Sequence, residues 1–226
     1  MSSPANTALV DRRTIRQYLP KPVPDNVVRD LLTEARWAPS ATNTQSTYVY
    51  VVTGEPLKQL KAENLNNSKA CISAEPDIEM NRDWPPLLQS RMSSAIQARE
   101  TFIKAEETKK GAKAAAVHPT VAVANLFGAP VLLILAFDKT IVPAYGGFDA
   151  GVLAQSIALA AHARGLGTSI TGSAIRYAYL LRRVIPETED KNFVIAIALG
   201  YPDWEAASNR FPRQRAPLDE WVSFVG

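Results

Sequence analysis

Two arginine-rich segments have the side chains to bind an anion. One spans residues 12–16 and the other residues 210–215, and their candidate residues are Arg12, Arg13, Thr14, Arg16, Arg210, Arg213 and Arg215. Guanidinium groups pair bidentately with phosphate oxygens. Neighbours in an extended segment point to opposite sides, so Arg213 and Arg215 share a side whereas Arg12 and Arg13 do not. Each segment also fits a solvated basic stretch, but two of them in a chain of net charge +3 favour one shared anion.

A third candidate is the uncharged polar loop at residues 39–45, with the sequence PSATNTQ. The side chains of Ser40, Asn43 and Gln45 offer neutral donors and acceptors. Such groups suit a ligand that is polar but uncharged along much of its length, such as a ribityl chain or the edge of a heterocycle. The alternative is a helix exit whose small polar side chains satisfy their own backbone.

Composition excludes several classes of site. The only cysteine is Cys71, which rules out an intrachain disulfide and a multi-cysteine zinc or iron–sulfur centre. His118 and His162 are far apart and lack metal-ligand spacing, so we expect no metal. A net charge of +3 does not indicate a nucleic-acid binder. The longest apolar run, residues 129–137, is far shorter than the roughly 20 residues that span a bilayer, and no signal peptide is recognisable. We therefore expect a protein of the reducing cytoplasm, without membrane or nucleic-acid partners.

No common hydrolytic or nucleotide motif is present. The chain lacks G-x-S-x-G, H-E-x-x-H and the P-loop, and "GLGTSITG" at residues 165–172 is not the G-x-G-x-x-G of a dinucleotide site. His162 lies in an apolar helical pattern and fits a structural histidine. Cys71 has no pattern around it that indicates catalysis. Binding, more than acid–base chemistry, is thus what the candidate residues indicate.

The elements that must position these residues follow from hydrophobic periodicity. Residues 11–24 are extended and rich in proline. A helix follows at 25–38, capped by Asp25 and ended by Pro39. A strand is expected at 46–54, a short helix at 55–66, and a largely solvated helix from residue 85, with an apolar stripe that includes Leu88, Met92 and Ile96 and a C-cap at Gly111.

The second half alternates buried strands with apolar helices. The run at 129–137 reads as a strand buried on both faces. A central helix is expected from Asp149, as its cap, to Gly165, then another helix at 173–185 and a last strand at 193–202. The tail carries Trp221 and Phe224, which favour docking on a partner surface. We predict one α+β domain over residues 1–226, a mixed central sheet flanked by helices, and a variable helical lid at about 68–120.

At this point the order of the motifs resembles the nitroreductase family of FMN-dependent oxidoreductases. "RRTIRQY" resembles its opening R-R-S-x-R-x-[FY], and "PVPDNVVRDLLTEARWAPSATNTQ" resembles the following segment that ends P-S-x-x-N-x-Q. "GAPVLLILAF", "FDAGVLAQSIALAAHARGLGTSITG" and "LGYPD…PRQRAPLDEW" are similar to its core strand, its central helix with G-[LI]-G-T exit, and its closing motif. The resemblance covers nearly the whole chain except about 68–120.

The resemblance implies an intertwined homodimer with FMN in each of two clefts at the interface. Arg12, Arg13 or Thr14, with Arg213 and Arg215, would hold the phosphate, and Arg16 would lie near the N1–C2 end of the flavin. Ser40, Asn43 and Gln45 would reach the cofactor of the other protomer, Asn125 its pyrimidine ring, and Thr171 and Gly172 its N5. The full set of implied cofactor-binding residues is Arg12, Arg13, Thr14, Arg16, Pro39, Ser40, Asn43, Gln45, Asn125, Ser169, Ile170, Thr171, Gly172, Arg213 and Arg215.

The resemblance also implies an activity. Hydride would pass from NADPH or NADH through flavin N5 to a nitroaromatic compound in a ping-pong cycle, giving nitroso and then hydroxylamino products. Trp84, Phe102 and Tyr145 are candidates to touch the aromatic electron acceptor, or to pack in a core. Two alternatives stay open. The same scaffold could reduce quinones, enones, halogenated phenols or free flavin, or the protein could be a non-catalytic binder of phosphorylated ligands or acidic partners.

Two positions depart from the family pattern. Relatives commonly continue Asn-x-Gln with Pro-Trp, whereas Gln45 is followed here by Ser46 and Thr47. Some members carry Glu near flavin N5, where this chain has Thr171. We therefore expect the loop after residue 39 to take its own path at Ser46.

Overall fold

The computed structural model describes residues 4–79, 83–109 and 119–226. Two compact units account for the chain. The first combines Met1–Met80 with Ala116–Asp203, and the second combines Asn81–Ala115 with Trp204–Gly226. The single domain with a lid at about 68–120 stays a prediction, and each unit is described by itself below.

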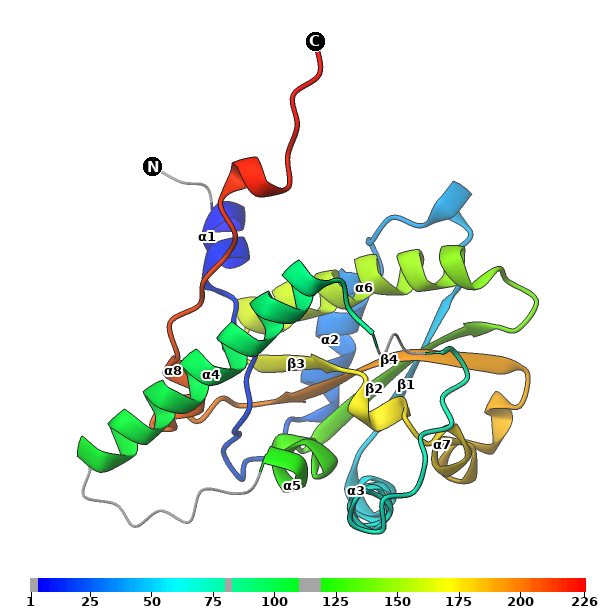
Figure 1. Ribbon diagram of the computed structural model, residues 1–226. Coiled ribbons are helices and arrows are strands. Elements are labelled where there is room, and N and C mark those ends of the chain that lie inside the picture. The colour runs from blue at the N-terminus through cyan, green and yellow to red at the C-terminus, as the bar shows by residue number, and fades with distance from the viewer. Residues whose placement is uncertain (1–3, 80–82, 110–118) are drawn as a thin grey trace. The chain divides into compact units, whose positions relative to one another are not determined.

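A four-stranded sheet forms the centre of the first unit (Figure 1). Its strands are β1 (Thr47–Val52), β2 (Val131–Asp138), β3 (Gly167–Thr171) and β4 (Lys191–Gly200), in the order β1-β2-β4-β3. The α+β prediction is confirmed. The prediction of a mixed sheet is wrong for these strands, because all three pairs are antiparallel. Central strands covered on both faces are apolar throughout whichever way they run, so their composition could not reveal direction.

Helices cover both faces of this sheet (Figure 1). On one face lie α2 (Asp25–Ala35) and α6 (Pro143–Ala163), packed on Val131, Leu133 and Leu135 of β2. On the other face lie α3 (Gly54–Lys69) and α7 (Ala178–Val184), packed on the alternate β2 residues Leu132 and Ile134. Successive side chains of a strand point to opposite faces, so β2 contributes to two cores. Its predicted burial on both faces is confirmed.

Helix α2 buries the predicted apolar face, with Val28, Leu31 and Ala35 inside. Its N-cap is Pro24 and no side chain caps it, so the predicted capping by Asp25 is wrong. Asp25 is instead the first helical residue, where its charge still complements the helix dipole. The helix ends at Ala35, before Pro39 is reached, and the loop of interest starts just beyond it.

Helix α6 starts at Pro143, and this contradicts the predicted start at Asp149. Proline is well suited to the first helical turn. The helix continues through Gly146, where a Cβ atom would lie 2.4 Å from the Phe137 ring, so only glycine lets α6 approach β2 this closely. The predicted end is confirmed, since Gly165 has a φ of +70° and terminates the helix.

Several elements lie outside the sequence-based prediction. Helices α1 (Pro4–Asp11) and α5 (Pro119–Ala124) and strand β3 were not predicted, and the helix expected at 173–185 is split into η3 (Ser173–Ile175) and α7. The remaining short 3-10 turns are η1 (Ala41–Asn43), η2 (Leu126–Gly128), η4 (Pro186–Thr188) and η5 (Leu218–Glu220).

The second unit consists of α4 (Pro86–Lys109), α8 (Ala207–Arg210) and the tail. Helix α4 buries none of its residues, so its predicted solvated character is confirmed. Phe102 packs edge-on against Phe211 with ring centroids 5.7 Å apart, and Glu220 forms an ion pair with Arg91. Trp221 is 69% exposed, and its docking on a partner stays a prediction. The predicted C-cap Gly111 lies outside the described residues.

Candidate active site

The first arginine segment runs beside strand β3. The backbone N–H of Ile15 donates to the carbonyl of Thr168 at 2.9 Å, and Thr14 forms a parallel bridge with Thr168. Ile15 is buried, so Thr14 and Arg16 on either side of it point the other way along an extended backbone. The structure therefore brings residues 12–16 next to the predicted residues of β3.

This placement depends on a close approach at Gly167. A Cβ atom there would lie 2.4 Å from Cγ1 of Ile15 and 2.8 Å from Cγ of Pro202. The hydroxyl of Tyr18 holds the same segment, since it donates to the carbonyl of Ala198 at 3.0 Å. Burial raises the pKa of Tyr18 above its ordinary value, so the phenol stays a neutral donor.

The end of β3 presents a mixture of polar and apolar groups. Ser169 is buried, Ile170 is 41% exposed, and Thr171 and Gly172 are half-buried. The Thr171 hydroxyl lies 2.7 Å from the Ser173 hydroxyl, so its orientation is set by its own turn. The side chain of Thr171, which is predicted to lie beside the flavin, is therefore oriented by the hydroxyl of Ser173.

A cavity of about 270 Å³ adjoins this turn. It lies among α3, α5 and η3, and its lining includes Asn64, Ser68, Ser173 and Arg176. The amide of Asn64 donates to the carbonyl of Ala124 at 2.9 Å and so joins α3 to α5. Asn125 follows directly, is exposed, and does not line this cavity.

The polar loop after α2 is held in an unusual backbone conformation. Thr42, Asn43 and Gln45 have φ values of 48°, 59° and 49°. The left-handed region costs a residue other than glycine about 1–2 kcal/mol. The Ser40 hydroxyl opposes this cost by accepting the N–H of Gln45 at 2.9 Å. The alternative that the loop satisfies its own backbone is thus correct for Ser40, and also for Gln45, whose side-chain amide donates to the carbonyl of Asn43 at 3.3 Å. The residues Asn43 and Gln45 are nevertheless exposed.

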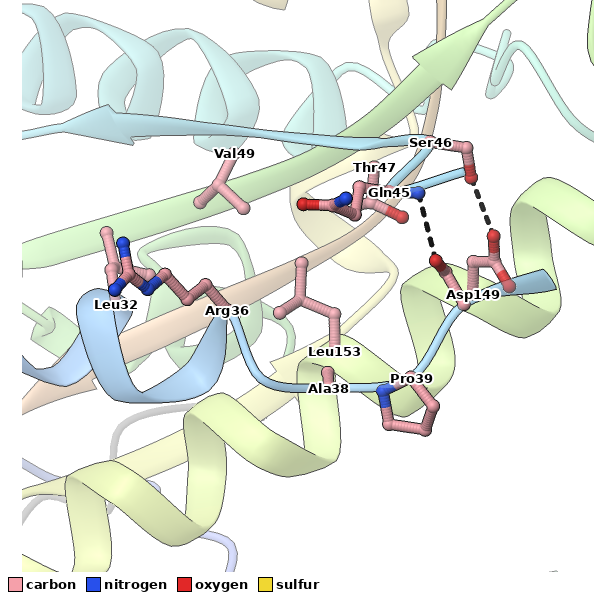
Figure 2. A pocket seen from close by; sticks show the side chains of 11 residues that line it. Leu32, Arg36, Ala38, Pro39, Gln45, Ser46, Thr47, Val49, Asp149 and Leu153 are labelled. Carbon is pink, nitrogen blue, oxygen red and sulfur yellow. Dashed lines mark hydrogen bonds between the residues drawn. The ribbon is translucent and has the colours of Figure 1, made fainter. Parts of the chain in front are cut away.

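Asp149 holds the same loop from helix α6 (Figure 2). Its carboxylate is only 3% exposed. One oxygen accepts the N–H of Ala41 at 3.0 Å. The other accepts the hydroxyl of Ser46 at 2.8 Å, a bond that Figure 2 draws. The sequence interpretation assigned Asp149 to a helix cap and so missed this role. The available signal was an acidic residue on a helix that is otherwise almost entirely apolar.

A second cavity of about 300 Å³ lies between this loop and the sheet (Figure 2). Leu32, Val49 and Leu153 give it apolar walls. The residues that add polar or charged groups are Arg36, Ser40, Gln45, Ser46, Thr47 and Asp149. Pro39 also lines it, whereas Asn43 does not. Three of the four predicted loop residues thus share one cavity.

The second arginine segment belongs to the second unit. Arg210 forms an ion pair with Glu106 at 3.2 Å, so a partner within its own unit engages it. Arg213 is half-buried, and exposed Arg215 donates to the carbonyl of Gln214 at 2.7 Å. An anion shared with residues 12–16 stays a prediction.

The three aromatic residues that are candidates to contact an aromatic substrate differ in their packing and exposure. Phe102 packs on Phe211 but is only half-buried, so it contacts another aromatic ring without lying in a core. Trp84 and Tyr145 are 46% and 62% exposed, so core packing is wrong for both.

Comparison with known proteins places this fold in a family. Residues 9–201 match the model of the "Nitroreductase family". The chain belongs to the nitroreductase family. The prediction of this family, and with it of an oxidoreductase, is confirmed. Among the residues that the structure describes, this nitroreductase has no helix that is long and apolar enough to cross a membrane.

Individual nitroreductases are similar over almost their full length. The chain is 30% identical to a 4-nitrobenzoate reductase of Pseudomonas putida, covering 98% of this chain and 95% of that one. It is 29% identical to a chloronitrobenzene nitroreductase of Comamonas testosteroni, covering 95% and 94%. The FMN-dependent nitroreductase NfnB of Mycobacterium smegmatis, solved in complex with NADPH, has a similar fold with a TM-score of 0.83, at 24% identity and 98% coverage of both chains.

Proposed function

We propose that this protein is an FMN-dependent reductase that uses NADPH or NADH to reduce nitroaromatic compounds. The pairing of residues 12–16 with β3 carries the proposal. It brings the segment assigned to the flavin phosphate onto the strand whose end is assigned to flavin N5, although more than 150 residues separate Thr14 from Thr168. The names of the nitrobenzoate and chloronitrobenzene reductases among the relatives support the substrate class.

The residues present fit FMN by their chemistry. A phosphate needs cationic donors, which Arg12, Arg13 and Arg16 provide, and their side chains are half-buried in this fold. The uncharged part of the cofactor needs neutral hydrogen-bonding groups and apolar contact, which Thr171 and Ile170 offer on β3. Resemblance to the family adds Arg213 and Arg215 for the phosphate, and Asn125, Pro39, Ser40, Asn43 and Gln45 for the remainder.

Bound FMN supplies hydride transfer at N5, from the nicotinamide and then to the nitro group, with nitroso and hydroxylamino products in a ping-pong cycle. The protein positions the reactants. On the family's assignment, Arg16 would bring a permanent positive charge to the N1–C2 end of bound FMN, where negative charge develops on reduction. Thr171 and Gly172 would lie beside N5 of bound FMN, and the Thr171 hydroxyl, 2.7 Å from that of Ser173, helps to fix their turn. The cavity next to Ser173 is where we expect a flat ligand to enter.

A homodimer is part of the proposal, since the loop at 39–45 is assigned to the cofactor of the other protomer. The exposed Trp221 and Phe224, at 69% and 87%, suit a tail that docks on a second copy. A cytoplasmic location stays a prediction that rests on the use of a single cysteine.

Purification tests the proposal directly. The protein should be a yellow dimer whose 450-nm-region absorbance is bleached by NADPH or NADH without oxygen and restored by 4-nitrobenzoate. Initial rates with both substrates varied should give the parallel lines of a ping-pong cycle. A protein that stays colourless with added FMN would contradict the proposal. If the flavin is bleached by the nicotinamide but is not re-oxidised by nitroarenes, quinones, enones, halogenated phenols or free flavin become the favoured substrates.

A substitution tests the phosphate assignment. Arg215→Ala should weaken FMN retention by about tenfold or more, because a charge-assisted hydrogen bond contributes about 1.5–3 kcal/mol. Arg29→Ala, on the exposed side of α2, is the matched control and should leave retention unchanged. Equal flavin content in both variants would remove Arg215 from the site.

A further inference from the structure

We propose that Asp149 is a positioning residue whose buried carboxylate holds the loop at 40–46 in the form that presents Ser40 and Gln45 to the flavin. The inference rests on the proposed function for the identity of the ligand. The hold on the loop itself rests on the hydrogen bonds of the structure. The hydrogen bonds of Asp149 go to the backbone of Ala41 and to the hydroxyl of Ser46, so its action passes through the loop backbone and Ser46.

The geometry of the carboxylate suits a clamp. Asp149 is 3% exposed, and a buried charge is tolerated only where hydrogen bonds replace its water. Its two oxygens bind two points of one loop, the N–H of Ala41 and the hydroxyl of Ser46. These points lie before and after the left-handed residues Thr42, Asn43 and Gln45. Both ends of the strained turn are therefore tied to one rigid helix.

The strained backbone of the loop explains why such a clamp is needed. Conformations of this kind persist only where the surrounding structure over-determines them. Inside the loop, Ser40 accepts the N–H of Gln45. The loop backbone also closes on itself, since the N–H of Asn43 donates to the carbonyl of Ser40 at 3.1 Å and that of Thr44 to the carbonyl of Ala41 at 3.0 Å. Asp149 adds the hold from α6. Without it, the turn can relax toward ordinary backbone angles, which would turn the side chains of Asn43 and Gln45 elsewhere.

The departure from the family pattern supports the same conclusion. Where relatives commonly have proline after Asn-x-Gln, this chain has Ser46. Proline stiffens a chain by fixing φ. Serine does not, but its hydroxyl donates to Asp149 at 2.8 Å. The hydrogen bond between Ser46 and Asp149 thus makes the loop rigid through helix α6, whereas a proline would do so through its own ring.

The experiment compares Asp149→Ala, Asp149→Asn, Ser46→Ala and the double variant Asp149→Ala/Ser46→Ala. The first readout is the Kd for FMN from flavin fluorescence. The second is hydrogen–deuterium exchange of the peptide covering residues 40–46 in FMN-free protein. Ser156→Ala is the matched control, because its hydroxyl donates within α6 to the carbonyl of Val152 and not to the loop.

Asp149→Ala should raise the Kd for FMN about 10-fold to 100-fold, as expected for charge-assisted hydrogen bonds, and should speed exchange in the loop. Ser46→Ala should have a smaller effect in the same direction. The double variant should be no weaker than Asp149→Ala alone, because both changes remove one shared interaction. Asp149→Asn should recover much of the affinity, since its amide can accept from Ala41 and donate to the Ser46 oxygen.

Several results would overturn the inference. If the wild type binds FMN and Asp149→Ala binds it equally well with unchanged exchange, Asp149 does not position the loop, while the proposed function stands. If the losses of FMN affinity in the two single variants add up in the double variant, Ser46 and Asp149 do not act through one shared interaction. A wild type that takes up no FMN removes the proposed function and the flavin part of this inference, and exchange alone then decides the hold on the loop. Should Asp149→Ala fail to fold, Ser46→Ala and Asp149→Asn still decide, through both readouts.

Discussion

Strand β2 and the apolar stripe of helix α4 differ in how far they are buried. Seven consecutive residues of β2 are buried, whereas no residue of the much longer α4 is. Leu88, Met92 and Ile96, which form the apolar stripe of α4, are 39%, 40% and 42% exposed. A strand between two helical layers is covered on both faces, while the residues that the structure describes leave the stripe of α4 about two-fifths exposed. Substitutions in β2 should therefore act on folding, and those in α4 on assembly.

The largest effect should come from Leu133→Ala in β2. Leu133 is fully buried in the cluster beneath α2 and α6. Truncation removes apolar contacts and leaves a cavity, at a cost of about 2–5 kcal/mol in the free energy of unfolding. Denaturant unfolding followed by circular dichroism measures it. A loss below 1 kcal/mol would mean that β2 does not carry the core.

A somewhat smaller effect is expected for Gly167→Ala. The new methyl group would press on Ile15 and Pro202, so overpacking should cost about 1–3 kcal/mol. Displacement of residues 12–16 should also release FMN. Gly151→Ala on α6 is the control, because nothing lies within 4 Å of its added Cβ. Equal unfolding curves for the two variants would refute the close approach at Gly167.

Surface charge should matter less than burial, and Glu34 tests this. Hydrogen bonds from Arg164 lower the pKa of the exposed Glu34 carboxyl below its ordinary value. A lowered folded-state pKa adds stability above the ordinary value of 4.5, and this is lost as pH falls through the folded pKa. In Arg164→Gln, the Glu34 pKa should rise toward 4.5, as seen by NMR titration. An unchanged Glu34 titration would show that the pair does not form in solution.

The smallest effect on folding is expected for Met92→Ala in α4. A side chain 40% exposed should change the unfolding free energy by less than about 0.5 kcal/mol. The measurement should be made at several protein concentrations. A large loss that grows on dilution would contradict exposure in solution, and would place the proposed contact between protomers on the α4 stripe.

Local sequence patterns predicted the helices and strands whose residues are buried at regular intervals or in an unbroken run. The periodicity of α2 and the apolar runs of β2 and β4 were sufficient to place them, because burial of these faces is continuous along the chain. Strand β3 was missed. Its five residues, from Gly167 to Thr171, become a strand through pairing with β4, which is a non-local cause.

The start of α6 and the role of Asp149 were misjudged for a related reason. Aspartate is a favoured N-cap residue, but Asp149 lies inside a helix that already runs through Gly146, where contact with Phe137 requires glycine. The site shows the same limit. Residue types and motif order predicted which groups would bind a cofactor, but only the topology makes Thr14 a neighbour of Thr168.

The strand order has a consequence for biosynthesis. Strand β4 lies between β2 and β3 but leaves the ribosome after both. Until residues 191–200 emerge, β2 can pair only with β1, and the edge that later binds β4 stays open along a strand whose first seven residues are apolar. Open edges of this kind recruit other chains. Translation that stalls before Lys191 should therefore yield an aggregating product, and completing this one strand closes the sheet from within.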